Sequence, residues 1–215
     1  MERADILGLA AYEARRHVLR PELMRAKQLR QVLVGDTLNF MFESHETVRY
    51  QIQEVLRVEA VKDEARIERE IATYNRLLGG PGELGCTLLV ELSGEQCAAQ
   101  LEALAGLESC LYVRTSDGRE VPARATSEST GQPLSLVQFL RFAVGGLGPI
   151  AVGCAHPLLC AEVALTPAKR RTLERDLDIG SSRGERYGRA SSATKTAPDA
   201  LPRSRFRGTA RGPLP

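Results

Sequence analysis

The sequence contains no tryptophan, and aromatic residues make up only 5% of its 215 positions. Hydrophobic residues nevertheless account for 43%, which is enough for a sizeable core. That core must therefore be built mainly from aliphatic side chains. A chain of this length most often forms one domain, or at most two small ones.

The five cysteines include no C-x-x-C pair, and no signal peptide opens the chain. Reduced thiols packed as small hydrophobic side chains, in a soluble cytoplasmic protein, are the expectation. One uncharged stretch, Ala143–Ala161, is as long as a membrane helix but contains four glycines and two prolines. We expect it to form two buried strands joined by a glycine-rich turn, without a membrane partner.

The net charge of +2 is unevenly distributed. Residues 179–215 contain eight basic and two acidic side chains, which leaves the preceding residues with a net charge of −4. The acidic residues 1–178 give no electrostatic footprint for nucleic acid, so binding to nucleic acid is not expected there.

Residues 179–215 are rich in Gly, Ser, Arg and Pro, and their apolar residues follow no helical or strand period. We expect a single domain at residues 1–178 and a disordered basic tail at 179–215. Weak RNA binding by the tail arginines is the alternative to a simple solvated extension.

Predicted helices and strands follow one another along residues 1–178, but they do not alternate strictly. The expected helices, the first of them a short helix or turn, cover residues 5–16, 21–30, 45–61, 63–78, 93–104 and 167–178. The expected strands cover residues 32–34, 38–42, 86–92, 107–114, 119–125, 134–144, 150–154 and 160–165. This order predicts an α+β protein with a mixed or antiparallel sheet and packed helices. Residues 86–114 form a strand–helix–strand unit, whose crossover would be right-handed if its strands were parallel.

Several polar residues gather at the helix expected after Ser44. At 100° per residue three of them share one side of the helix, one lies at the margin and one lies just before the helix. These residues are Tyr50, Glu54 and Arg57, then Gln51, then Glu43. They could hold a small polar ligand or a partner. They could equally form pairs on a solvated face, worth about 0.2–0.5 kcal/mol each.

Other motifs support no catalytic or metal site. Three candidate ligands lie close in sequence, Cys154, His156 and Cys160, but a structural zinc site needs four ligands. The alternative is that His156 shapes the exit of a strand. The string Gly146–Ala151 matches G-x-G-x-x-A, yet no helix pattern follows it, which excludes a dinucleotide site. With no nucleophile motif either, catalytic residues and cofactors stay unknown.

Residues 38–92 contain a long and specific string, T-V-R-Y-Q-I-Q-E, at Thr47–Glu54. Shorter strings accompany it at 42–43, 56–57, 70, 74–75, 87–91, 139–142, 156–157 and 176–177. In these stretches the chain resembles an uncharacterised bacterial family, a domain of unknown function. Members of that family tend to be encoded beside rubrerythrin-like proteins and heterodisulfide-reductase-like iron–sulfur proteins. The chain departs from the family pattern at Ala155 and Leu159, where the family has Asp and Tyr.

The resemblance implies an accessory or partner-binding protein of a bacterial redox or peroxide-defence system. Its partners would then be rubrerythrin-like or iron–sulfur oxidoreductase proteins. It draws attention to six residues as ligand- or partner-binding positions: Glu43, Tyr50, Gln51, Glu54, Arg57 and His156. The alternative function is that of a small-ligand or metal-binding protein, possibly an enzyme, which would use a Glu/Tyr/Arg/His site.

Overall fold

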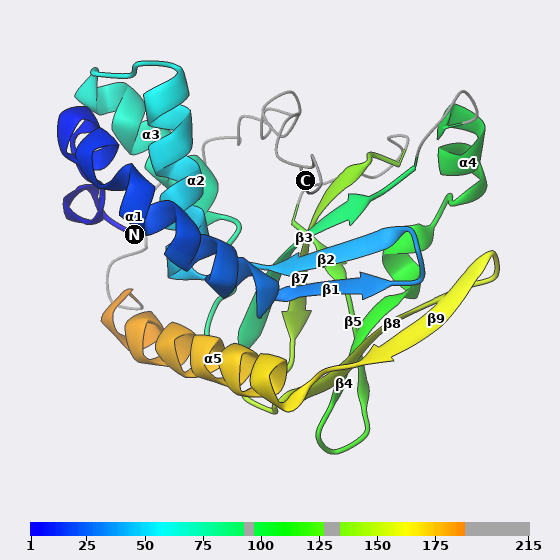
Figure 1. The fold of residues 1–215 in the computed structure, drawn as a ribbon. Coiled ribbons are helices and arrows are strands. Elements are labelled where there is room, and N and C mark those ends of the chain that lie inside the picture. The colour runs from blue at the N-terminus through cyan, green and yellow to red at the C-terminus, as the bar shows by residue number, and fades with distance from the viewer. Residues whose placement is uncertain (93–96, 127–133, 188–215) are drawn as a thin grey trace.

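A computed structural model describes residues 1–92, 97–126 and 134–187 (Figure 1). Its helices are η1 (Arg3–Asp5), α1 (Leu9–Gln28), α2 (His45–Val58), α3 (Glu64–Asn75), α4 (Cys97–Ala103), η2 (Leu107–Cys110) and α5 (Pro167–Tyr187). Its strands are β1 (Gln31–Val34), β2 (Leu38–Phe42), β3 (Glu83–Val90), β4 (Leu111–Thr115), β5 (Glu120–Pro122), β6 (Arg124–Ala125), β7 (Val137–Ala143), β8 (Pro149–His156) and β9 (Leu159–Ala164).

The strands form two sheets, and every neighbouring pair is antiparallel. One sheet has the order β1-β2-β3-β7-β6, and the other has the order β5-β4-β8-β9. The predicted α+β class is confirmed. The expected strand at residues 119–125 is divided between the sheets, because β5 lies in one and β6 in the other. The strands at the two ends of residues 86–114 also belong to different sheets, so they do not form a parallel crossover unit.

The main core lies between the two sheets. Phe40, Phe42 and Phe142 face inward from the first sheet, and Val113 and Val152 from the second. The rings of Phe42 and Phe142 lie 6.2 Å apart, at a tilt that suits aromatic packing. Each such fully buried side chain stabilises the fold by about 1.5–3 kcal/mol. Leu173 and Leu177 add α5 to the same core.

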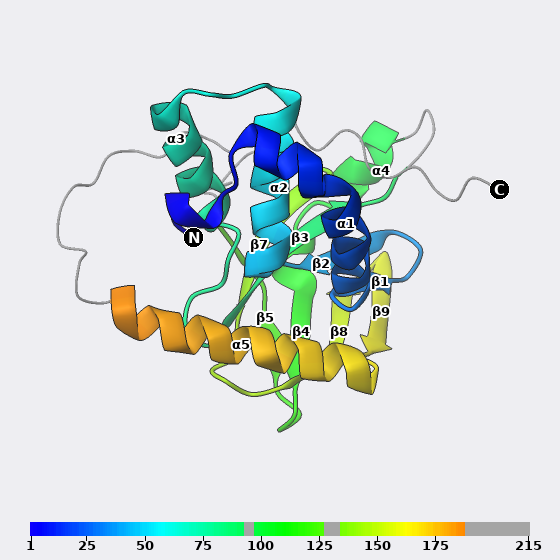
Figure 2. The same ribbon diagram turned by 60° about the vertical axis from the view of Figure 1, so that its left-hand side comes forward.

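A second, smaller core joins η1, α2 and α3 beside the five-stranded sheet (Figures 1 and 2). The predicted apolar stripe of α2 supplies Val48, Ile52 and Leu56, which are buried, while Val55 is partly buried. Phe139 of β7 packs against this core from the other face of its strand. The five-stranded sheet therefore has hydrophobic side chains on both faces.

Two predicted boundaries differ from the structure. The helices expected at 5–16 and 21–30 are one continuous helix, α1, with Pro21 inside it. Pro21 is exposed, so water can satisfy the carbonyl that loses its partner. The last helix passes Asp178 and continues to Tyr187. Of the tail predicted to be disordered, residues 179–215, the part from residue 188 on lies outside the described residues, as does the predicted start of a helix at residue 93.

Among the described residues, no helix combines the length and the apolar character that crossing a membrane requires. The uncharged stretch flagged in the sequence forms β8, its turn and part of β9.

Candidate functional site

The first turn of α2 positions the polar cluster around Glu43. Ser44 is the N-cap, as predicted: its side chain accepts a hydrogen bond from the Thr47 backbone N–H at 3.3 Å. The Thr47 hydroxyl in turn accepts from the Ser44 N–H at 2.9 Å. This reciprocal cap fixes where α2 begins and turns Thr47 back toward the end of β2.

Glu43 is 6% exposed, and its carboxylate is held by neutral donors alone. It accepts hydrogen bonds from the hydroxyls of Thr47 at 2.5 Å and Thr87 at 2.7 Å. The Gln51 amide donates to both carboxylate oxygens, at 3.0 and 3.1 Å. A buried carboxylate is tolerated only when such donors replace its water. Glu43 thereby ties the end of β2 to α2 and β3.

Gly85 allows the strands to meet closely behind Glu43. Its carbonyl accepts a hydrogen bond from the Glu43 N–H at 2.8 Å. A Cβ atom at this position would lie 2.0 Å from the backbone oxygen of Leu77, so a side chain cannot fit without moving the backbone. Glycine is therefore required at this position of β3 by the close packing of the backbone.

Glu54, further along α2, is held mainly by cations. Arg16 donates to both of its oxygens, through Nε at 2.7 Å and Nη2 at 3.0 Å. The Tyr12 hydroxyl donates at 2.7 Å, and Arg57 Nη2 donates at 3.2 Å. Tyr12 and Arg16 come from α1, so this network fastens α1 to α2.

These contacts determine the protonation of Glu54. Partial burial acts to raise the pKa of Glu54, but the hydrogen bonds from Arg16, Tyr12 and Arg57 outweigh it and lower that pKa to about 2. Burial and the Glu54 carboxylate raise the pKa of Tyr12 above its ordinary value. Glu54 is thus a carboxylate at neutral pH and too weak a base to remove protons effectively.

Tyr50 lies beside this network, one turn before Glu54. Partial burial and the Glu54 charge raise the pKa of Tyr50, while the nearby Arg16 and Arg20 of α1 act to lower it. The structure therefore brings Tyr50, Glu54 and Arg57 together at the α1–α2 interface. Glu43 and Gln51 form a separate cluster.

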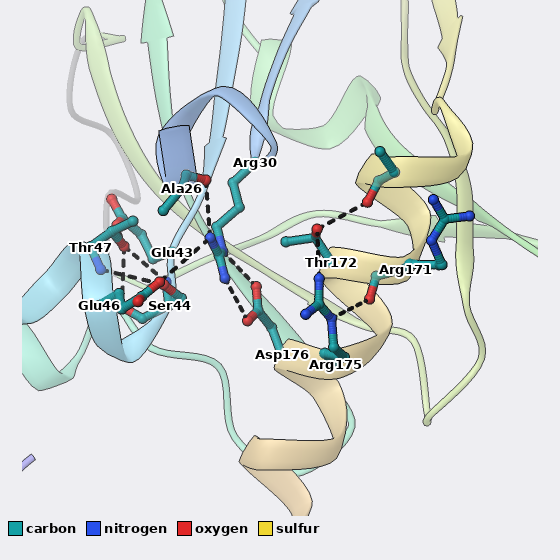
Figure 3. Close-up of polar contacts among 11 residues, drawn as sticks. Ala26, Arg30, Glu43, Ser44, Glu46, Thr47, Arg171, Thr172, Arg175 and Asp176 are labelled. Atoms are coloured by element: carbon teal, nitrogen blue, oxygen red, sulfur yellow. Dashed lines mark hydrogen bonds and ion pairs between the residues drawn. The ribbon is translucent and has the colours of Figure 1, made fainter. Parts of the chain in front are cut away.

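An ion pair between Arg30 and Asp176 lies near Glu43 (Figure 3), and the three residues line a small cavity. Arg30 donates to Asp176 of α5 through Nε at 2.7 Å and Nη2 at 2.9 Å, and lies 4.0 Å from Glu46. The cavity has a volume of about 120 Å³, and Glu43, Arg30, Asp176, Glu46 and Glu83 are among its lining residues. A space of this size holds a few water molecules or one small polar group.

His156 belongs to the second sheet. Its Nδ1 accepts a hydrogen bond from the Leu158 N–H at 3.3 Å, and its own N–H donates to Cys154 Sγ at 3.4 Å. Cys160 pairs with Ala155, so it faces the opposite side of the sheet from Cys154 and His156. No contact between described residues joins His156 to the polar residues of α2. The described part of the chain also contains no group of three or more His, Cys, Asp or Glu side chains suited to a metal.

Sequence reasoning missed the partners of both carboxylates. Tyr12 and Arg16 are one turn apart in α1 and both lie within the helix or turn expected at residues 5–16, so helical spacing alone would have placed them on one face. Thr87 interrupts an apolar strand, and the period-two pattern of a strand turns it to the opposite face from Cys86 and Leu88. These signals existed, but their partners lie 38 to 44 residues away in the sequence.

The chain was compared with known proteins. No curated protein matches it. A crystal structure described as a novel protein of unknown function from Burkholderia pseudomallei K96243 is similar, with a TM-score of 0.76 and 31% sequence identity. The match covers 83% of this chain and 99% of that one. Residues 1–177 match the family described as "Protein of unknown function (DUF3501)". The chain therefore belongs to this family of proteins of unknown function, DUF3501.

Proposed function

We propose that the protein is a non-enzymatic accessory protein that binds a partner in a bacterial redox or peroxide-defence system. One observation carries this proposal: the carboxylates that a catalytic site would need are already committed to internal hydrogen bonds. Both oxygens of Glu43 accept from Thr or Gln side chains, and both oxygens of Glu54 accept from arginines.

The two carboxylates are poorly suited to proton transfer for different reasons. The pKa of Glu54 near 2 leaves it a weak base, because protonation would break its contacts with Arg16 and Arg57. Glu43 is buried among neutral donors, and a substrate could reach it only by displacing them. Groups arranged in this way hold a fold together and support a surface rather than a reaction.

The choice of partner rests on the family resemblance. We propose a rubrerythrin-like protein or an iron–sulfur oxidoreductase as the partner, in the cytoplasm, where such systems operate on reduced thiols. The residues for this role are the partly exposed Tyr50, Gln51 and Arg57 of α2. His156 would belong to the binding surface only if the partner also covered the end of β8.

Capture of purified partners tests this proposal. The immobilised full-length protein should retain one of the two candidates from the same bacterium at both 50 and 150 mM salt. A bound partner should also dissociate faster when Tyr50 is changed to Ala, whereas Val58→Ala, at an exposed position of the same helix, serves as the matched control. If neither candidate is retained at either salt concentration, the proposal is wrong.

A second candidate function is favoured by the cavity beside Glu43. Its carboxylate lining, of Glu43, Glu46, Glu83 and Asp176, would suit a small cationic ligand. Native mass spectrometry and elemental analysis of protein purified without oxygen test this alternative. A stoichiometric ligand or metal that is lost in Glu43→Gln would favour it over the accessory function, and an empty protein would count against it.

A further inference from the structure

Two arginines at the α1–α2 interface share one carboxylate, that of Glu54. Arg16 Nη2 and Arg57 Nη2 both donate to the same oxygen of Glu54, at 3.0 and 3.2 Å. The two guanidinium groups therefore lie side by side, each with somewhat over a quarter of its side chain exposed. Among the described residues, Glu54 is the one carboxylate that forms an ion pair with either arginine.

A third arginine extends this positive region. Tyr50 lies close enough to Arg20, Arg16 and Glu54 to interact with their charges. Arg16, Arg20 and Arg57 carry three positive charges against the one negative charge of Glu54. Like charges held together in a partly buried place repel each other, and a bound anion relieves that repulsion.

Arg16 and Arg57 also have more N–H donors than they have hydrogen-bond acceptors among the described residues. Each guanidinium has five N–H groups, and Arg16 uses only its Nε and Nη2 edge on Glu54. Arg57 uses one nitrogen on Glu54, and its buried Nε has no acceptor among the described residues. A buried N–H without an acceptor is uncommon and marks Arg57 as incompletely satisfied.

We infer that Arg16 and Arg57, flanked by Arg20 and Tyr50, bind one oxyanion: a phosphate, sulfate or carboxylate group. Arginine pairs that share an edge recognise such groups through charge-assisted hydrogen bonds. The inference deepens the proposed function and rests on it in one respect, namely that a partner would present the oxyanion as an acidic side chain. Glu54 keeps the two guanidinium groups in place, so the site is preformed.

Isothermal titration of the full-length protein tests the site. The probes are inorganic phosphate, sulfate and glutarate, with chloride used to hold the ionic strength constant. Binding of one or more probes is expected, and Arg57→Gln should weaken it about tenfold or more, because a charge-assisted hydrogen bond is lost. Arg49→Gln removes the same charge from an exposed position of the same helix and should change the affinity less than about twofold.

The pattern of binding identifies the source of the oxyanion. Binding of glutarate indicates a carboxylate donated by a partner, whereas binding of phosphate and sulfate alone indicates a free oxyanion. If no probe binds, or if Arg57→Gln and Arg49→Gln weaken binding equally, the inference is overturned. Arg57→Gln should fold, since Glu54 keeps Tyr12 and Arg16, and Arg57→Lys provides a second variant that retains the charge.

The same variants separate this inference from the proposed function. If anions bind through Arg57 but neither redox protein is captured, the site is supported and the choice of partner is wrong. If a partner is captured equally well by Arg57→Gln and no anion binds, the partner-binding function stands and the oxyanion site is wrong.

Discussion

Glu43 and Glu54 are both glutamates bound by side chains of α2, yet their surroundings differ. Glu43 is 6% exposed and accepts only from neutral Thr and Gln groups. The Glu54 side chain is 21% exposed and accepts from two arginines and a tyrosine. The comparison shows that side chains of one helix can hold nearby carboxylates by two means: neutral hydrogen-bond donors in the interior, and ion pairs near the surface.

The two arrangements have different consequences for the molecule. Around Glu43 no cation contacts the carboxylate among the described residues, so the cluster is a rigid junction of β2, β3 and α2. Around Glu54 the cations exceed the anion, so the cluster both joins α1 to α2 and leaves positive charge facing solvent. We attribute structure to the first cluster and binding to the second.

The largest expected effect is that of Glu43→Ala. The change leaves the donors of Thr87 and Gln51 without their acceptor inside the protein, whereas the Thr47 hydroxyl still donates to the Ser44 carbonyl at 3.1 Å. The expected cost is about 3 kcal/mol in the free energy of unfolding. Urea denaturation measures it. Glu46→Ala, at an exposed position in the first turn of the neighbouring α2, is the control and should cost no more than about 1 kcal/mol. Equal costs for the two variants would show that Glu43 is not a junction.

A smaller effect is expected from the titration of Glu54. Its pKa in the folded protein, about 2, lies below its ordinary value of 4.5, so the ionised form stabilises the fold. This stabilisation is fully present above pH 4.5 and is lost as the pH falls toward 2. After screening by solvent it amounts to about 1–2 kcal/mol. In Glu54→Gln the stability measured between pH 5 and 2.5 should fall less steeply; an unchanged slope would contradict the cation-held carboxylate.

The smallest effect is expected from Tyr12→Phe. Tyr12 is buried, and its hydroxyl donates one of the four hydrogen bonds to Glu54. Its loss should cost about 1 kcal/mol, since Arg16 and Arg57 still satisfy the carboxylate. Thermal unfolding at neutral pH measures the change. A cost equal to that of Glu43→Ala would mean that the two clusters do not differ as proposed.

Much of the fold could be predicted from local patterns. The helices α2 and α3 and strands such as β3 and β7 lie close to their expected positions, because caps, apolar periodicity and glycine-rich turns are encoded nearby. The division of the strands into two sheets could not be predicted, since pairing depends on contacts between distant segments. Pro21 misled the prediction of α1, because an exposed proline is tolerated where water replaces the lost hydrogen bond.

The candidate site was predicted only in part. Helical spacing correctly placed Tyr50, Glu54 and Arg57 on one side of α2, away from its apolar stripe. It could not reveal that Arg16 and Tyr12 would meet Glu54, nor that Thr87 would meet Glu43, because these pairs form only when the elements pack. Whether the site residues bind a ligand or a partner stays a prediction.

The most direct test of this account is the pKa of Glu54, measured by NMR titration of its side-chain carboxyl carbon in the folded protein. We predict a value near 2, with a shift toward 4.5 in Arg16→Gln. A value at or above 4.5 in the wild-type protein would contradict the account, because Glu54 would then be neither held by arginines nor excluded as a base.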